Sequence, residues 1–307
     1  MMTHRSLGPA LGAALLCAGA AFAHDEPAPP EHEGAHEGGA HGAVYTKDNY
    51  PTEVIKRPLE LPDGMLQVNL GLDINLSSSI NNAAGDTVVG PFKPVHTPLS
   101  AFYGIGGKLQ VGIETSGLCL NSENCEKVIE DVGVEAAFGV IHQKGLEMSV
   151  QGGLSFSWPG IAQADGTVAT NVFASLAVGV DVRLQQDQFA VRAGPKLFFG
   201  LTHRDGTTNR EYLRVPIDFQ FQADPHLVLD FGMDLNLFLD PPDPLGFGDF
   251  IGIPLRVGAI YAINRQFDVG AVFTFTNLLG KSDAFVFGPS GFDGRQLSVF
   301  VAFRPAL

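Results

Sequence analysis

Four histidines near the N-terminus alternate with acidic residues, a composition that can bind transition metals. They are His24, His32, His36 and His41, in the run HDEPAPPEHEGAHEGGAHG, which also holds Glu31, Glu33 and Glu37. Imidazole and carboxylate groups are ligands for Zn, Cu or Ni. The spacing is irregular, so two interpretations stay open: a weak metal site, or a solvated spacer too poor in apolar residues to fold.

A second set of charged residues recurs at alternate positions within apolar segments. Alternate side chains of a β-strand share one face, so these charges would line the inside of a barrel. The set comprises Asp73, Glu135, Asp181, Asp218 and Asp234, with Arg192, Arg214 and Arg256 as counter-charges. Such residues either line a wet passage or pair into a network that fills it. A passage of this kind would favour cations or small neutral solutes over anions.

Hydrolysis of lipids is the competing chemistry, since it needs a serine and a histidine at a lipid-facing rim. His203 is the candidate base, and Ser155 and Ser157 are the candidate nucleophiles. Both serines share the parity of the inward charges, and the chain has no GxSxG segment. We therefore expect no catalytic residues and no cofactor.

Two cysteines, Cys119 and Cys125, have five residues between them in a connection between predicted strands. In an exported chain this spacing favours a loop disulfide, with two free thiols as the alternative.

The element that would position these residues is a repeated β-strand. From Leu66 to Phe303 apolar and polar residues alternate with a period of two. We predict an all-β, transmembrane, antiparallel up-and-down barrel of twelve strands: residues 64–77, 97–105, 108–116, 130–141, 146–157, 169–184, 188–202, 211–222, 227–239, 249–263, 266–279 and 293–304.

The connections between these strands alternate in length. Those after the even-numbered strands have about four residues or fewer, and the others have roughly eight to twenty, as is typical of outer-membrane barrels. Outward parity also places aromatic residues near the short-turn end, where they would form an interfacial girdle: Tyr103, Phe189, Phe221, Tyr261, Phe267 and Phe303. Phe156, Phe199 and Phe275 would form a sparser ring near the other end. Pro195, Pro216 and Pro254 interrupt the pattern, and we expect bulges there.

The chain begins with a predicted signal peptide, residues 1–23, that ends in Ala21-Phe22-Ala23. Residues 24–63 are expected to be a disordered periplasmic tail and a Pro-punctuated lead-in, and residues 64–307 the barrel. No apolar stretch of the mature chain is long enough to span a bilayer as a helix. The formal net charge of −14 argues against a nucleic-acid partner.

The leader, the alternating strands and the final segment GRQLSVFVAF resemble Gram-negative outer-membrane β-barrel proteins. The final segment is similar to the terminal signal read by the barrel-insertion machinery, although Arg304, Pro305, Ala306 and Leu307 follow its last aromatic residue. The segments RPLELPDGMLQV and YGIGGKLQVGIE also resemble a group of poorly characterised porin-like barrels. The resemblance implies an address in the outer membrane, contact with its lipids, and passage of small solutes.

The sequence thus favours a passive pore for small solutes or ions in the outer membrane of a Gram-negative bacterium. The alternatives are a scaffolding barrel with a metal-binding periplasmic tail and, third, the lipid hydrolase.

Overall fold

The computed structural model describes residues 45–76, 80–81, 87–88, 95–119, 129, 131–158, 160–162, 168–170, 172–204, 209–240, 251–276, 278 and 294–305. The predicted signal peptide, its cleavage site near Ala23 and the four tail histidines lie outside these ranges, as does Cys125. The metal site and the disulfide therefore stay predictions. Within the described ranges, no helix is long and apolar enough to cross a membrane.

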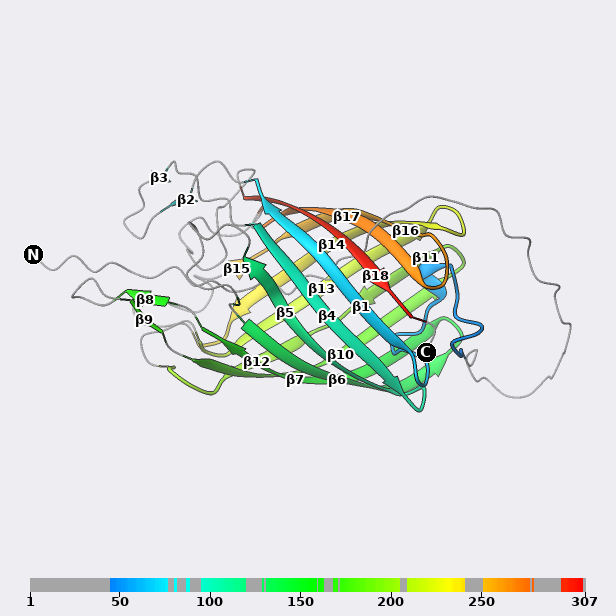
Figure 1. The fold of residues 1–307 in the computed structure, drawn as a ribbon, viewed down its shortest axis with the longest axis horizontal. Helices are drawn as coiled ribbons and strands as arrows, with labels where there is room; N and C mark the ends of the chain where they lie inside the picture. The colour runs from blue at the N-terminus through cyan, green and yellow to red at the C-terminus, as the bar shows by residue number, and fades with distance from the viewer. Residues whose placement is uncertain are drawn as a thin grey trace, which may run out of the picture.

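One antiparallel sheet of fourteen strand segments closes into a barrel with strongly tilted strands (Figure 1). Closure is direct, because β1 pairs with both β4 and the last strand, β18. The segments are β1 (Leu66–Asn75), β4 (Val95–Ile105), β5 (Leu109–Cys119), β6 (Asp131–Gln143), β7 (Leu146–Ser157), β10 (Phe173–Gln186), β11 (Phe189–Ala193), β12 (Lys196–Gly200), β13 (Tyr212–Gln222), β14 (Leu227–Phe238), β15 (Ile251–Gly252), β16 (Leu255–Ala262), β17 (Phe267–Phe275) and β18 (Arg295–Phe303).

The predicted count of twelve strands is confirmed. The sheet has fourteen segments because two of its twelve strands are each interrupted next to a proline and so consist of two segments. β11 and β12 flank Gly194-Pro195, and β15 and β16 flank Ile253-Pro254. Two short hairpins lie outside the barrel sheet: β2 (Ile80–Asn81) with β3 (Thr87–Val88), and β8 (Gly160–Ala162) with β9 (Val168–Thr170). The short connections have two to four residues and the long ones eleven to nineteen, as the alternation predicts.

The prolines do not shift the register, so the expectation of bulges there was wrong. Ala193 pairs with Ile217 and Lys196 with Arg214, which is the same register on both sides of Pro195. β13 pairs with β14 without a break through Pro216. Each proline lacks an N–H donor, but its own carbonyl still accepts a hydrogen bond from the neighbouring strand. Val180 N donates to Pro195 O and Asp234 N to Pro254 O, both at 3.1 Å.

Register shifts occur instead between Thr97 and Leu99 and between Gly139 and Ile141. The second shift could not be recognised in the sequence, because residues 139–141 contain no proline.

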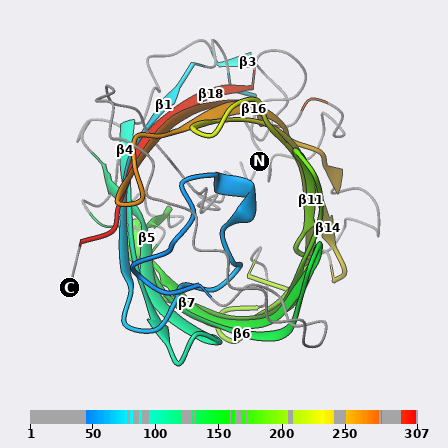
Figure 2. The same ribbon diagram turned by 90° about the vertical axis from the view of Figure 1, so that its right-hand side faces the viewer.

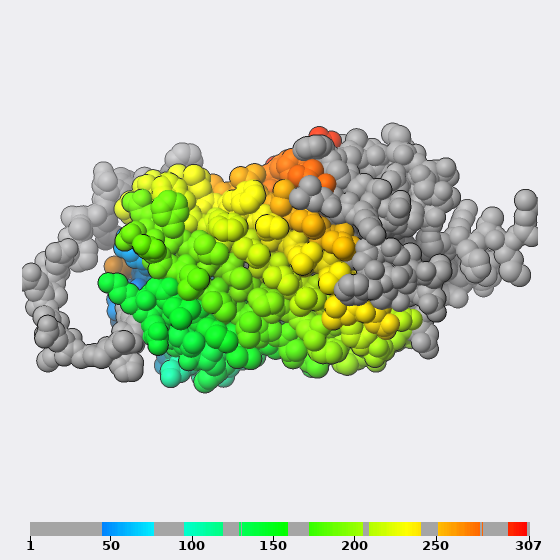
Figure 3. All heavy atoms as spheres, turned by 180° about the vertical axis from the view of Figure 1, so that it is seen from behind, coloured from blue at the N-terminus to red at the C-terminus, as the bar shows by residue number. Residues whose placement is uncertain are grey.

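The outer face of the barrel is apolar over its full circumference. Large hydrophobic residues with outward parity are exposed on every part of it, among them Leu70, Val134, Val178, Phe231 and Val257. Figure 3 shows the outer surface from behind, where the colour of the chain changes from green through yellow to orange. Rings of the predicted girdle contact each other across strands, with centroids 4.9 Å apart for Phe189 and Phe221 and 4.6 Å for Phe267 and Phe303.

Residues 50–62, called the luminal segment below, lie inside the barrel at the end that carries the short turns (Figure 2). The segment contains one turn of 3-10 helix, η1 (Val54–Lys56), and buries Tyr50, Ile55 and Leu61. The sequence identified residues 51–63 only as a lead-in to the first strand and did not predict that they pack inside the barrel. The amino-acid composition of a segment indicates only whether it can bury enough apolar surface by itself. Here the inner wall of the barrel provides the surface against which the segment packs.

Candidate functional site: the lumen of the barrel

The inner face of β13, β14 and β16 carries a connected network of ion pairs. Asp234 is 2% exposed and accepts hydrogen bonds from Arg214 Nε at 2.9 Å and Arg256 Nη1 at 2.5 Å. The other nitrogen of the same guanidinium, Arg256 Nη2, donates to Asp218 at 2.6 Å. Asp218 and Arg256 meet across Gly232 of β14, where a Cβ would lie 2.4 Å from Asp218 Oδ1. Two arginines and two aspartates therefore tie three strands together.

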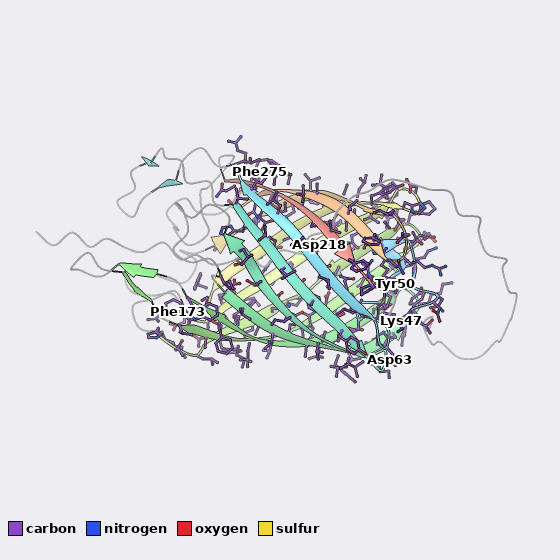
Figure 4. All side chains as sticks on the ribbon, viewed as in Figure 1. Lys47, Tyr50, Asp63, Phe173, Asp218 and Phe275 are labelled. Carbon is purple, nitrogen blue, oxygen red and sulfur yellow. The ribbon has the colours of Figure 1, made fainter. Side chains whose placement is uncertain are left out.

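The network continues on the adjoining strands. Arg192 of β11 donates to Asp181 of β10 through Nε at 2.9 Å, and Gln151 of β7 donates to the same carboxylate at 3.0 Å. Two more pairs are Lys196 with Glu135 at 2.8 Å and Arg183 with Glu147 at 2.7 Å. Figure 4 places Asp218 midway along the barrel, between Phe173 and Phe275 at one end and Tyr50 and Asp63 at the other.

The opposite wall is polar but carries fewer charges. Asn69 of β1 donates to Ser100 of β4 at 2.8 Å and accepts from Gln67 at 2.9 Å. Asp73 lies on this wall, in register with Ser298 of β18 and His96 of β4. Seven of the eight predicted lining residues are thus brought together on one wall, and Asp73 is separate from them.

The densely charged wall has an excess of acidic groups. Seven carboxylates face five bases; they are Glu114, Glu135, Glu147, Asp181, Asp218, Asp230 and Asp234 against Arg183, Arg192, Lys196, Arg214 and Arg256. Asp230 accepts a hydrogen bond from the side-chain amide of Gln220 at 2.9 Å. The wall therefore carries strong local fields and a small acidic excess.

The luminal segment is attached to the barrel through Arg57, which shares the carboxylate of Asp268 with Arg304. Arg57 donates to both oxygens of Asp268 at 2.5 and 2.8 Å, and Arg304, just after β18, donates to the same group at 2.6 Å. The ring of Tyr50 lies 5.4 Å from the Arg57 guanidinium and 5.3 Å from that of Arg304. Asp268 is 2% exposed, so this fastening is shielded from water.

The rest of the segment crosses the lumen from wall to wall. Ile55 packs against Ala190 and Val228, and its N–H donates to Gln222 of β13 at 3.3 Å. Leu59 N–H donates to Glu147 of β7 at 2.9 Å, and Leu61 N–H donates to Gln110 of β5 at 3.1 Å. Side chains of the barrel thus accept hydrogen bonds from backbone N–H groups of the segment, which has almost no regular secondary structure.

Sequence reasoning missed this segment as part of the site. The sequence feature that could have indicated it is a pair of isolated apolar residues, Ile55 and Leu61. They stand beside the single charges Arg57 and Glu60, between prolines. That pattern has no strand or helix period, so it reads as a connection.

The residues of the hydrolase alternative lie at the end of β7 and β10. The ring of His203 lies 5.7 Å from that of Phe173, and Phe173 is in register with Ser157 of β7. Ser155 is in register with Ser175 of β10.

Comparison with known proteins gives a fold but no family. No family model matches the chain, and no curated protein matches it. Among solved structures it is similar to the COG4313 outer membrane channel from Pseudomonas putida F1, at 13% identity and a TM-score of 0.54, over 80% of this chain and 97% of that one. The NanC porin follows, at 8% identity and a TM-score of 0.49, over 78% and 98% of the two chains.

The closed twelve-stranded barrel, apolar outside and charged inside, is a β-barrel of the Gram-negative outer-membrane type. Its individual features are the ion-pair wall and the luminal segment at the short-turn end.

Proposed function

We propose that the protein is a passive channel of the outer membrane for small polar solutes and ions, with a mild preference for cations. The observation that carries the proposal is the ion-pair wall. A folded barrel can fill its interior with apolar side chains, yet this one places twelve ionisable groups along one inner wall. Such groups are stabilised by water and by each other, and they create a polar path for solutes.

The short turns and the luminal segment would face the periplasm, and the apolar outer face would contact the lipid. We also propose that the signal peptide is cleaved near Ala23 and that the barrel-insertion machinery then inserts the barrel into the outer membrane. The preference for cations rests on the small acidic excess of the wall, together with Asp73 on the other side. Similarity to a solved outer-membrane channel supports the same function.

Swelling of proteoliposomes in isotonic solutions tests this function without a voltage. We expect swelling in small neutral and cationic solutes, with slower swelling for anions of equal size and for larger solutes. Empty liposomes are the control, and the change in electrophoretic mobility on heating shows that the barrel is folded. Absence of swelling from a folded barrel would contradict the proposal.

A scaffolding barrel is the second candidate, and the luminal segment is the observation that favours it. A segment fastened on both sides of the lumen is compatible with a barrel that stays closed and acts through its tail. In that case Zn²⁺ or Cu²⁺ should bind to His24, His32, His36 and His41. Calorimetric titration of the mature chain against a chain lacking residues 24–44 would detect it.

A further inference from the structure

Glu60 of the luminal segment is a carboxyl group buried without a suitable partner. Its side chain is 1% exposed. Neither carboxylate oxygen has a hydrogen bond of normal geometry within the described part of the chain. A buried carboxylate normally accepts several hydrogen bonds or pairs with a base, since otherwise its desolvation is costly. An ionised Glu60 would therefore be unstable at this position.

The groups around Glu60 come from three strands. His142 of β6 places Nε2 at 3.8 Å from Glu60 Oε2, and this nitrogen also has no hydrogen bond of normal geometry. Glu147 of β7 and Asp181 of β10 add negative charge nearby, and Ser149 of β7 contributes a hydroxyl. Glu147 and Asp181 are themselves paired with Arg183 and Arg192.

The barrel wall is shaped to receive this pair of side chains. Gly139 of β6 lies where a Cβ would come within 2.6 Å of Glu60 Oε2 and 2.1 Å of His142 Nε2. The two groups thus occupy a space that any other residue at position 139 would fill. The contact belongs to the docked segment and is lost when the segment leaves the wall.

The proton count of this contact depends on pH. When Glu60 holds its proton, the contact contains a neutral carboxyl beside the imidazole. When Glu60 loses its proton, the contact contains a buried carboxylate close to two other acidic groups, Glu147 and Asp181. Burial is the main cause that raises the pKa of Glu60 to about 7; the Ser149 hydroxyl opposes this rise, and Glu147 and Asp181 add to it.

The fastening at Arg57 behaves differently. There a single carboxylate, Asp268, is shared by two guanidinium groups that keep their charge throughout the range in which Glu60 titrates. One attachment of the segment is therefore permanent and the other is sensitive to protons.

We propose that Glu60 and His142 form a proton-dependent latch, which docks the luminal segment across the lumen in acid and releases it as the pH rises to neutral. This inference rests on the proposed channel function, because it assigns a regulation to that channel. Release frees residues 58–62 from β5, β6 and β7, while Arg57 keeps the segment attached to β17. The channel then conducts better at neutral pH than in acid.

The direction follows from linkage. A pKa of Glu60 that is raised from 4.5 to about 7 on docking means that the docked state holds its proton more tightly. Docking is therefore strongest below pH 4.5, weakens as the pH rises to about 7, and changes little above that. Between pH 5 and pH 7.5 the docking equilibrium falls by about 60-fold.

Macroscopic conductance of the mature chain in planar bilayers, measured at pH 5 and pH 7.5, tests the latch. We expect the ratio of open to docked channels to rise by about 60-fold, or until opening saturates. Glu60→Gln mimics the protonated group, so its conductance should stay low and vary less than twofold with pH. Glu53→Gln is the control, because Glu53 pairs with Lys56 on the solvent side of the same segment, and it should respond as the wild type does.

Two results would overturn the latch: a wild type whose conductance does not change with pH, or a Glu60→Gln variant that opens as the wild type does. Gly104→Ala, which displaces the segment by a steric clash with Leu61 and Pro62, separates this failure from failure of the channel itself. If that variant conducts while the wild type is silent at both pH values, the channel function stands and the latch is wrong. If every folded variant is silent, the channel function fails.

Discussion

At the scale of residues, Asp268 is the group on which the luminal segment depends most. Its carboxylate holds Arg57 of the segment and Arg304 after the closing strand, and all three groups are buried. A buried carboxylate that balances two guanidinium groups cannot be removed without leaving uncompensated positive charge.

We expect Asp268→Asn to destabilise the folded barrel by about 3 kcal/mol. The measurement is the urea midpoint of the heat-dependent mobility shift. Glu53→Gln, which removes an exposed pair in the same segment, should change stability by less than about 0.5 kcal/mol. Equal effects of the two substitutions would show that the buried triad is not a special anchor.

Asp234 is the residue on which the balance of the charged wall depends, because it accepts from both Arg214 and Arg256. Asp234→Asn leaves the wall with one carboxylate fewer and both arginines in place. We expect the cation-to-anion permeability ratio to fall about two- to fourfold, as read from the reversal potential in a salt gradient.

The matched control for that substitution is Asp187→Asn, in an exposed two-residue turn with a positive φ of 50° that asparagine also adopts. It removes the same charge outside the lumen, so the permeability ratio should not move. An equal shift in both variants would assign selectivity to the overall charge of the protein rather than to the wall.

At the scale of elements, the luminal segment approaches β4 at Gly104. Gly104 N donates to Met65 O at 2.9 Å, Gly64 N donates to Gly104 O at 2.9 Å, and a Cβ at position 104 would lie 2.1 Å from Pro62 O. Backbone atoms fill the space, so no side chain can move aside to relieve the clash.

Gly104→Ala should therefore displace residues 61–62 while the barrel stays closed. At pH 6, where the wild-type segment is docked, we expect trypsin to cleave after Lys56 at least tenfold faster in this variant than in the wild type, since local release exposes the backbone to the protease. Gly152→Ala is the control, because its Cβ would meet only Ala177 O at 3.8 Å. Cleavage at the wild-type rate would mean that the segment is held by its other contacts alone.

The strands were predictable because one face of each is exposed apolar surface and the other is polar, which fixes a period of two. The inward parity of Asp181, Asp218, Asp234 and Arg256 followed directly from it. Pro195, Pro216 and Pro254 were misjudged, because a proline keeps its carbonyl as an acceptor, and the N–H donors that bind this carbonyl lie elsewhere in the sequence. The luminal segment could not be predicted, since its partners, Gln110, Glu147, Gln222 and Asp268, are spread over four distant strands.

His142 shows the same limit for a single side chain. In the sequence it stands beside a short turn, where a histidine is ordinarily exposed. The register shift between Gly139 and Ile141 and the presence of Glu60 give it a role that only the closed barrel defines.

At the scale of the whole molecule, the barrel combines a lipid-compatible outer face, a charged inner wall and a segment that crosses one mouth. Twelve strands give a lumen between the side-chain-filled eight-stranded barrels and the open sixteen-stranded porins. In the proposed channel, the docking of the luminal segment would set how much of this space is open.

Single-channel recording of the mature chain in a planar bilayer at pH 7.5 tests this account most directly. We predict discrete conductance steps and a reversal potential in a KCl gradient displaced toward that of K⁺. A silent bilayer from folded wild-type protein, and equally from the Gly104→Ala variant with its segment released, would contradict the existence of a conducting path.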